Sequence, residues 1–259
     1  PHPRYIATDG MTAIAKALST KLDINRSLRV VRLSANQAWT LICETGETFE
    51  ARSIVLAIPA PQAVPLLESI EAPPADLLDQ VRLAEFDPCL TVIATYPARY
   101  QAEVNALPWR AIEVRNDDFA WIGIDSSKRP KPAAPVIVIH SSLEFANRFL
   151  EAEDLQPIAK QLLDRASRLL PWLSQPETMQ IHRWRYAFAR RVLGFVPSAI
   201  DPLPIVCCGD WCMGANVEAA LRSGEVAAVA MHELLEGCAR QSVKRSLPAL
   251  NFAEMMGAL

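Results

Sequence analysis

The sequence is poor in glycine, with nine glycines among 259 residues, and no two of them lie two positions apart. A GxGxxG dinucleotide-binding loop and a glycine-rich kinase loop are therefore excluded, and a P-loop is excluded because GxxxxGK[ST] is also absent. The net charge of −3 disfavours a non-specific nucleic-acid binder, because such proteins are usually basic. No apolar run reaches the roughly 18 residues that a membrane span requires, so we expect no membrane association.

The six cysteines lack the spacing of a metal site or of a disulfide framework. Cys207 and Cys208 are adjacent in an apolar run, no CxxC occurs, and Cys208 and Cys212 have no histidine at zinc-finger spacing. We therefore predict unpaired core thiols and no bound metal. Unpaired thiols are typical of a reducing compartment, and we expect a cytoplasmic protein.

Apolar patterning predicts an α/β fold with mixed α+β character. The run SIVLAI at 53–58 is typical of a parallel strand that is buried on both faces. Several segments between 90 and 140 alternate polar and apolar residues, which favours an antiparallel or mixed sheet with one exposed face. We expect helices at 11–22, 74–86, 155–170 and 215–235, and strands at 28–33, 39–44, 48–50, 53–58, 90–96, 111–115, 119–124, 136–140 and 205–208.

The strongest chemical signal is CCGDWCMGANVEAALRSGEVAA at 207–228. A buried strand delivers Gly209 and Asp210 at its carboxyl end, and Gly214 permits close backbone approach at the entry of a helix rich in small residues. The amino end of a helix carries unpaired N–H groups and partial positive charge, so it can hold an anionic or electron-rich group. A helix that packs tightly without any ligand explains the same composition, and the residues alone leave both interpretations open.

This segment resembles the carboxyl-terminal FAD signature of flavin-dependent amine oxidases. Three further stretches resemble the renalase-like branch of that family in the same order. They are Gly10–Met11 with the helix to Leu22, the adenine-side strands with the turn IVLAIPAPQA (Val30–Leu33, Trp39–Leu41 and 53–64), and the strand HRWRYA at 182–187. The resemblance implies a partial Rossmann-like FAD-binding domain, 1–60 and 201–237, with an inserted mixed-sheet substrate domain, 61–200, and a tail, 238–259.

The resemblance also implies roles for individual residues. Asp210 would accept hydrogen bonds from the ribityl hydroxyls of FAD, beside Gly209. The backbone of Ala215, Asn216 and Val217 would meet the flavin pyrimidine edge near Gly214. Val30 would contact adenine, and Pro59 would shape the turn near the dinucleotide. On a strand, Trp184 and Tyr186 share one face with His182, so we expect them to wall the flavin ring or the substrate.

The chain departs from the family pattern because the GxGxxG block that precedes these segments does not occur in it. We expect a missing amino-terminal segment or a partner to complete the FAD site. The resemblance implies an FAD-dependent oxidoreductase that passes hydride from a small amine or a reduced nicotinamide-type substrate to flavin, with O2 as the expected oxidant. The alternative is a non-catalytic remnant or interaction module of the same fold without FAD. A hydrolase is disfavoured because no GxSxG motif occurs.

Overall fold

The computed structural model describes residues 7, 10–115 and 117–236. Contacts divide the chain into two compact units, one formed by residues 1–20 and 87–188 and the other by residues 21–86 and 189–259. The predicted tail at 238–259 lies outside the described residues. Helices α2 and α3 belong to the second unit, whereas the sequence-based division placed residues 61–86 with the inserted domain.

The first unit, called here the central unit, is built on a five-stranded sheet with the order β6-β7-β8-β5-β9. Its strands are β5 (Glu85–Thr95), β6 (Ala111–Glu113), β7 (Phe119–Ile124), β8 (Val136–Ser141) and β9 (Thr178–Arg191). Its helices are α1 (Thr12–Leu18), α4 (Gln101–Ala106), α5 (Leu143–Phe149) and α6 (Gln156–Ala166), with 3-10 turns at Ala98–Tyr100, Asp125–Lys128 and Pro171–Ser174.

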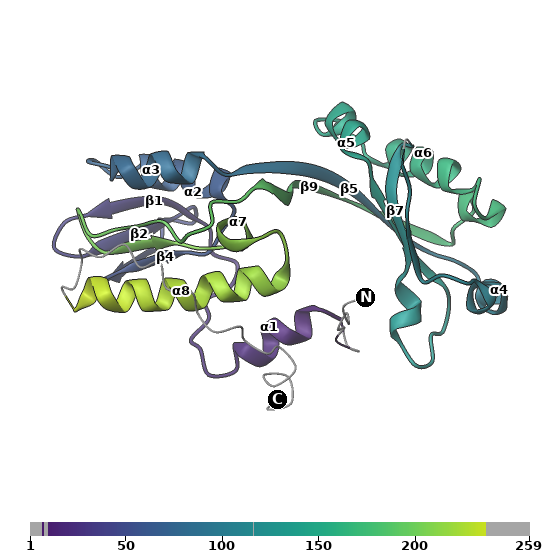
Figure 1. Ribbon diagram of the computed structural model, residues 1–259, viewed down its shortest axis with the longest axis horizontal. Coiled ribbons are helices and arrows are strands. Elements are labelled where there is room, and N and C mark those ends of the chain that lie inside the picture. The colour runs from purple at the N-terminus through teal and green to yellow at the C-terminus, as the bar shows by residue number, and fades with distance from the viewer. Residues whose placement is uncertain (1–6, 8–9, 116, 237–259) are drawn as a thin grey trace. The chain divides into compact units, whose positions relative to one another are not determined.

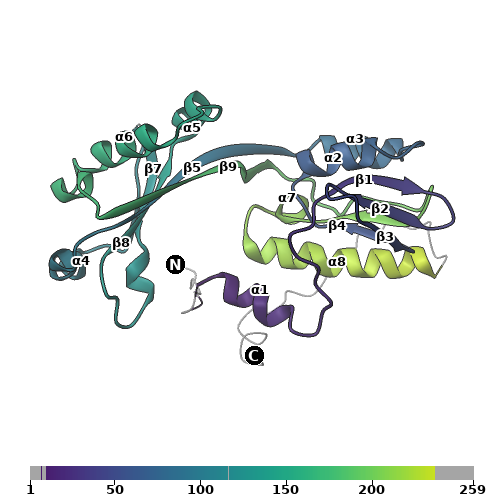
Figure 2. The same cartoon turned by 180° about the vertical axis from the view of Figure 1, so that it is seen from behind.

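Helices α5 and α6 cover one face of this sheet, as both ribbon views show (Figures 1 and 2). The α6 residues Ala159, Leu162, Leu163 and Ala166 are buried against Ile122, Ile137 and Ile139 of the sheet. The β8 residues alternate between half-buried and buried along the strand, as the sequence pattern predicted. One face of the sheet is therefore core, and the other is partly open.

The second unit, called here the terminal unit, contains two small sheets. One has the order β1-β2-β3, with β1 (Val30–Ala35), β2 (Trp39–Cys43) and β3 (Thr48–Ala51), and the other has the order β10-β11-β4, with β10 (Ser198–Ala199), β11 (Ile205–Cys207) and β4 (Ile54–Leu56). Its helices are α2 (Ala60–Glu68), α3 (Ala75–Arg82), α7 (Asp210–Met213) and α8 (Val217–Leu235).

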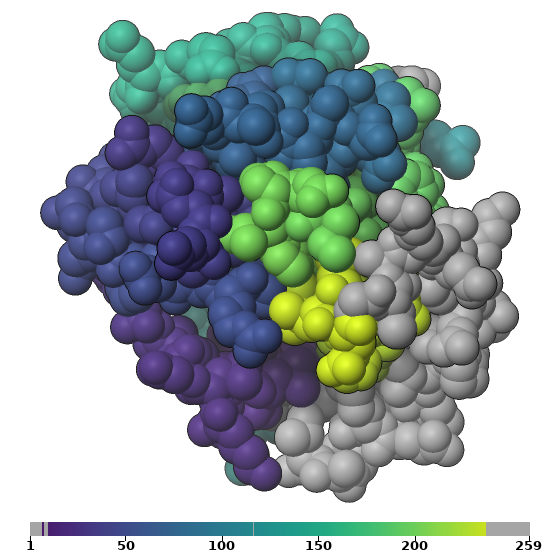
Figure 3. Space-filling view, turned by 90° about the vertical axis from the view of Figure 1, so that its left-hand side faces the viewer, coloured from purple at the N-terminus to yellow at the C-terminus, as the bar shows by residue number. Residues whose placement is uncertain are grey.

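The core of the terminal unit lies between its two sheets and α2 and α3. Leu33 and Trp39 pack in one buried cluster with Ile54, Leu67 and Trp211. Residues that follow β9, such as Leu193 and Val196, pack against the same cluster, and Figure 3 shows this green segment beside the blue segment of α2 and α3.

Strand β4 differs from the expectation of burial on both faces. Ile54 and Leu56 are buried, but Val55 between them is 45% exposed. Its partner Val206 on β11 is fully buried, because Val206 packs with Ala227 and Met231 of α8. Among the described residues β4 is the edge strand of its sheet, and helix α8, which covers Val206, leaves Val55 partly exposed.

Candidate functional site

The turns that follow β4 and β11 lie at the same edge of one sheet. The two strands run parallel and in register, with Leu56 opposite Cys207. The indole Nε1 of Trp211 donates a hydrogen bond to the carbonyl oxygen of Ile58 at 3.1 Å and so ties the two turns together. Ligands of open α/β sheets bind outside the carboxyl ends of such strands. The structure thus brings the predicted residues Pro59, Gly209 and Asp210 to one sheet edge.

Gly209 is required by the close approach of the Trp211 indole. A Cβ at position 209 would stand 2.5 Å from the indole Nε1, a distance that side chains do not tolerate. The Gly209 N–H donates to Ser223 Oγ at 2.9 Å, and Ser223 Oγ donates in turn to the Ala220 carbonyl at 2.7 Å. Ser223 is fully buried. Helix α8 therefore holds the turn through a single buried hydroxyl.

Asp210 is partly buried in this turn. Its Oδ1 accepts the Trp211 N–H at 2.8 Å, and no ion-pair partner for it lies among the described residues. Burial raises the pKa of the Asp210 carboxyl, and the Trp211 N–H opposes that rise only in part. A carboxylate kept in such surroundings costs stability, which is typical of residues retained for binding or catalysis.

The amino end of α8 presents unpaired N–H groups beside the turn. Asn216 caps the helix, since its side chain accepts the Ala219 N–H at 2.8 Å and its own N–H donates to the Gly214 carbonyl at 2.9 Å. For the N–H groups of Val217 and Glu218 the described residues supply no acceptor. Val217 is 59% exposed. The positive end of the helix dipole is therefore free to meet an electron-rich group.

The backbone at Gly214 and the small residues of α8 serve packing as well as access. A Cβ at position 214 would lie 3.3 Å from the Ala219 Cβ, so the loop lies tight against the first turn of the helix. The buried face of α8 is Ala219, Ser223, Ala227 and Met231 at steps of four residues. In contrast, Ala215, Gly224 and Ala228 are exposed. The packing interpretation therefore accounts for the buried face of α8, and the interpretation that the helix holds a ligand stays a prediction.

Val30 lies apart from the two turns. It opens β1 in the other small sheet of the terminal unit, where it pairs with Cys43 and packs at the margin of the core. The structure does not test the predicted contact of Val30 with adenine, which stays a prediction.

Trp184 and Tyr186 lie on β9 of the central unit. As the alternation predicted, the neighbouring arginines point to the other face: Arg183 donates to the Ala152 carbonyl, and Arg185 forms an ion pair with Glu151. Trp184 is 54% exposed, and its ring centroid lies 6.1 Å from that of His182. The aromatic side chains of β9 thus share the partly open face of the sheet.

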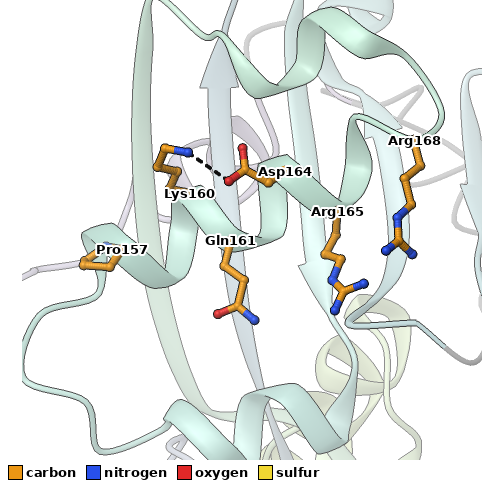
Figure 4. A pocket seen from close by; sticks show the side chains of 6 residues that line it. All are labelled: Pro157, Lys160, Gln161, Asp164, Arg165 and Arg168. Atoms are coloured by element: carbon orange, nitrogen blue, oxygen red, sulfur yellow. Dashed lines mark hydrogen bonds and ion pairs between the residues drawn. The ribbon is translucent and has the colours of Figure 1, made fainter.

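A pocket of about 430 Å³ lies elsewhere, on the outer side of α6 (Figure 4). Its charged side chains are already paired. Lys160 lies 2.9 Å from Asp164, and Arg165 lies 2.9 Å from Asp118. None of the predicted site residues lines it, so this pocket is a poor candidate for the chemistry that the sequence suggests.

The thiols of the terminal unit are packing residues. Cys207, Cys208 and Cys212 are buried and unpaired, and burial raises the pKa of the Cys207 thiol to about 12. Thiols so protonated are poor nucleophiles. In the described part of the chain no cluster of three or more His, Cys, Asp or Glu side chains could hold a metal. No helix there is long and apolar enough to cross a membrane.

The comparisons with known proteins identify the family. The sequence profile of the flavin containing amine oxidoreductases matches residues 2–232. The chain belongs to this family. It is 23% identical to renalase of Mus musculus over 238 residues, a match that covers 85% of this chain and 66% of that protein.

Solved structures of flavin amine oxidoreductases share the fold. Cyclohexylamine oxidase from Brevibacterium oxydans matches with a TM-score of 0.64 at 17% identity, over 88% of this chain and 53% of that chain. A putative protoporphyrinogen oxidase from Exiguobacterium matches with a TM-score of 0.65 at 15% identity, over 88% and 51%. Wild-type putrescine oxidase bound to putrescine matches with a TM-score of 0.63 at 18% identity, over 90% and 53%.

These matches confirm the mixed α/β fold of the Rossmann-like FAD-binding amine oxidoreductases. The chain spans two thirds of the length of renalase and about half the length of the solved structures. The predicted roles of individual site residues and the division into cofactor and substrate domains stay predictions.

Sequence reasoning missed three residues of the central unit and undervalued two of the terminal unit. The motif at 207–228 contains Trp211 and Ser223, but its spacing does not show that these two side chains support the turns. Trp121, Gly123 and His140 lie together on the partly open face of the central sheet, and the strand patterns that contain them do not mark them as site residues. A glycine inside the strand pattern WIGI was an available signal, since such a glycine often marks a close approach.

Proposed function

We propose that this chain supplies the flavin-contacting part of an FAD-dependent oxidoreductase. The observation that carries the proposal is the pair of turns at the ends of β4 and β11, joined by Trp211 and Ile58 and placed beside the free amino end of α8. Family membership adds support, since the family is flavin-containing.

The residues present fit FAD on two grounds. Asp210 is a partly buried carboxyl without a cationic partner in the described chain, as expected of a group that accepts bonds from ligand hydroxyls. Val217 and Glu218 offer N–H groups that lack acceptors in the described structure. In the proposal Asp210 and Gly209 hold the ribityl chain, and the backbone of 214–217 meets the electron-rich edge of the flavin.

When bound, FAD supplies the hydride acceptor of the reaction. The protein's part is to bind and orient. Partial positive charge at the amino end of α8 stabilises negative charge at the adjacent ligand edge, which favours the reduced cofactor. Trp184 and Tyr186 are proposed to wall the substrate, a small amine or a reduced nicotinamide-type compound, and O2 is the proposed oxidant.

The pyrophosphate of FAD needs a further binding element. No GxGxxG loop occurs in the 259 residues, and such loops hold pyrophosphate at a helix amino end. We assign this role to a segment or partner outside this sequence. Val30 and Pro59 are proposed to lie at the adenine side. The cytoplasm, predicted from the unpaired thiols, is the proposed compartment.

The test is to add FAD to the purified chain, remove oxygen, and follow the visible absorbance of oxidised flavin while adding benzylamine or a dihydronicotinamide. Loss of absorbance that depends on the chain, and its recovery on admitting O2, supports the proposal. FAD that stays free in solution, with no change in its absorbance or fluorescence, supports the alternative of a non-catalytic module.

A further inference from the structure

The partly open face of the central sheet carries an ordered row of side chains. Register places Glu113, Trp121, His140 and Thr91 opposite one another across β6, β7, β8 and β5. The next row along the strands is Ala111, Gly123, Val138 and Ile93. Residues two apart on a strand share a face, so both rows belong to the face opposite the one that α5 and α6 cover.

Trp121 is fixed in place by the glycine beside it. A Cβ at position 123 would lie 2.1 to 2.9 Å from the six-membered ring of the Trp121 indole. The indole therefore lies along the strand over Gly123, and Gly123 is buried although it has no side chain of its own. Any other residue at position 123 would push the indole off the strand.

His140 and Phe188 extend this surface. The ring centroids of Trp121 and His140 lie 4.8 Å apart, with 34° between the ring planes. The Phe188 ring lies 6.5 Å from that of His140, and 48% of Phe188 is exposed. These spacings lie in the range at which aromatic rings contact one another. The three rings form a continuous platform, defined here as Trp121, His140 and Phe188.

The platform is uncharged at its centre. Gly123, Val138 and Thr91 surround it within the two rows, and Glu113 stands at the edge strand beyond Trp121. Burial, with help from the nearby Lys128, lowers the pKa of His140 and keeps its imidazole neutral at physiological pH. Within the two described rows Glu113 is the sole carboxylate, and it is exposed, so a saturated cation gains little there, whereas a flat conjugated ring gains contact with every member of the platform.

We infer that Trp121 and His140 form a binding platform for a flat, conjugated ring, held ready by Gly123 as a positioning residue. The inference deepens the proposed function, since it rests on the ring being that of the substrate. It adds to Trp184 and Tyr186 on β9 a specificity-determining pair on strands β7 and β8 of the same sheet. Because Trp121 is already flat on its glycine, the ring loses little freedom when a ligand stacks on it.

A purely structural interpretation competes with this one. An aromatic residue that covers a glycine within a sheet stabilises the strand without binding anything. The two interpretations differ in their prediction for ligand binding, because a covering tryptophan alone gives no preference for flat ligands.

The experiment uses the whole chain and four probes: benzamide, cyclohexanecarboxamide, benzylamine and cyclohexylmethylamine. They separate ring flatness from charge, and binding is followed by tryptophan fluorescence and calorimetry. We expect both flat probes to bind about three- to tenfold more tightly than their saturated partners, the range that ring stacking supplies. Trp121→Leu should abolish the difference. The matched control Trp109→Leu, at a tryptophan packed on the helix-covered side, should keep it.

Gly123→Ala tests the positioning role through a double-mutant cycle. If the added methyl group acts only by displacing the indole, Gly123→Ala should lower affinity for benzamide as much as Trp121→Leu does. The double variant should then bind no worse than Trp121→Leu alone. Circular dichroism confirms that each variant is folded, and a misfolded Gly123→Ala leaves Trp121→Leu and His140→Gln to decide.

Equal binding of flat and saturated probes by the wild-type chain, or no binding of either, overturns the inference. So does unchanged selectivity in Trp121→Leu. The titrations need no flavin, so they can fail while FAD binding succeeds, and FAD binding can fail while they succeed.

Discussion

Removal of one buried hydroxyl, in Ser223→Ala, tests how α8 holds the Gly209 turn. The fully buried Ser223 hydroxyl accepts the Gly209 N–H at 2.9 Å, and the alanine leaves that half-buried N–H without an acceptor. A buried donor left unsatisfied costs about 1–3 kcal/mol. We therefore expect the free energy of unfolding to fall by that amount, measured by urea denaturation followed by circular dichroism.

The matched control is Ser167→Ala at the end of α6. Ser167 also donates to a carbonyl three residues earlier, that of Asp164 at 2.7 Å, but it lies at the surface. This variant should change the free energy of unfolding by no more than about 0.5 kcal/mol. If Ser223→Ala costs no more than Ser167→Ala, the Gly209 turn is not held through Ser223, and our account of the turn is wrong.

Three further predictions concern the same two units. Because burial raises the pKa of Asp210, its carboxyl favours folding most when protonated, and that contribution is lost as the pH rises through the raised pKa. Asp210→Asn should therefore be at least as stable as wild type at pH 7 by urea denaturation, and a clear loss of stability would contradict this. Because burial lowers the pKa of His140, its contribution is complete above about pH 6.5 and is lost as the pH falls below that value, so His140→Gln should flatten the pH dependence of unfolding between about pH 7.5 and 5.5. Trp211→Phe loses the indole hydrogen bond to Ile58, and Trp39→Phe loses the one to Pro204, so each variant should lower the free energy of unfolding in urea by about 1–3 kcal/mol. Only Trp211→Phe should also weaken FAD binding in a fluorescence titration.

Local patterns in the sequence predicted much of the fold. The alternation at 136–140 matches β8, and the strands expected at 39–44 and 48–50 match β2 and β3, which are joined by a turn with a positive φ at Gly46. Such patterns act within a few residues, so the sequence displays them directly. The run at 53–58 predicted burial on both faces, which is wrong for Val55. Whether another element covers Val55 depends on distant parts of the fold, and the run itself does not contain that information.

The sequence displays the residues of the candidate turn, but not the side-chain hydrogen bonds that hold the turn in place. Gly209, Asp210 and Gly214 stand in a motif that the sequence displays. In contrast, the hydrogen bonds from the Gly209 N–H to Ser223 and from the Trp211 indole to Ile58 join residues that are 14 and 153 positions apart. The placement of Trp121 over Gly123 also depends on side-chain rotation, which a single sequence does not reveal. Tertiary packing decides such contacts, and motif spacing does not.

The central claim is that the Gly209–Asp210 turn and the amino end of α8 contact flavin. Its most direct test is the affinity of the chain for FAD, titrated by flavin fluorescence, in wild type, Asp210→Ala and the control Asp79→Ala, an exposed aspartate of α3 in the same unit. Hydrogen bonds to a charged group are worth about 1.5–3 kcal/mol, so Asp210→Ala should weaken binding at least about tenfold while Asp79→Ala leaves it unchanged. Equal affinity of Asp210→Ala and wild type for FAD would contradict the claim.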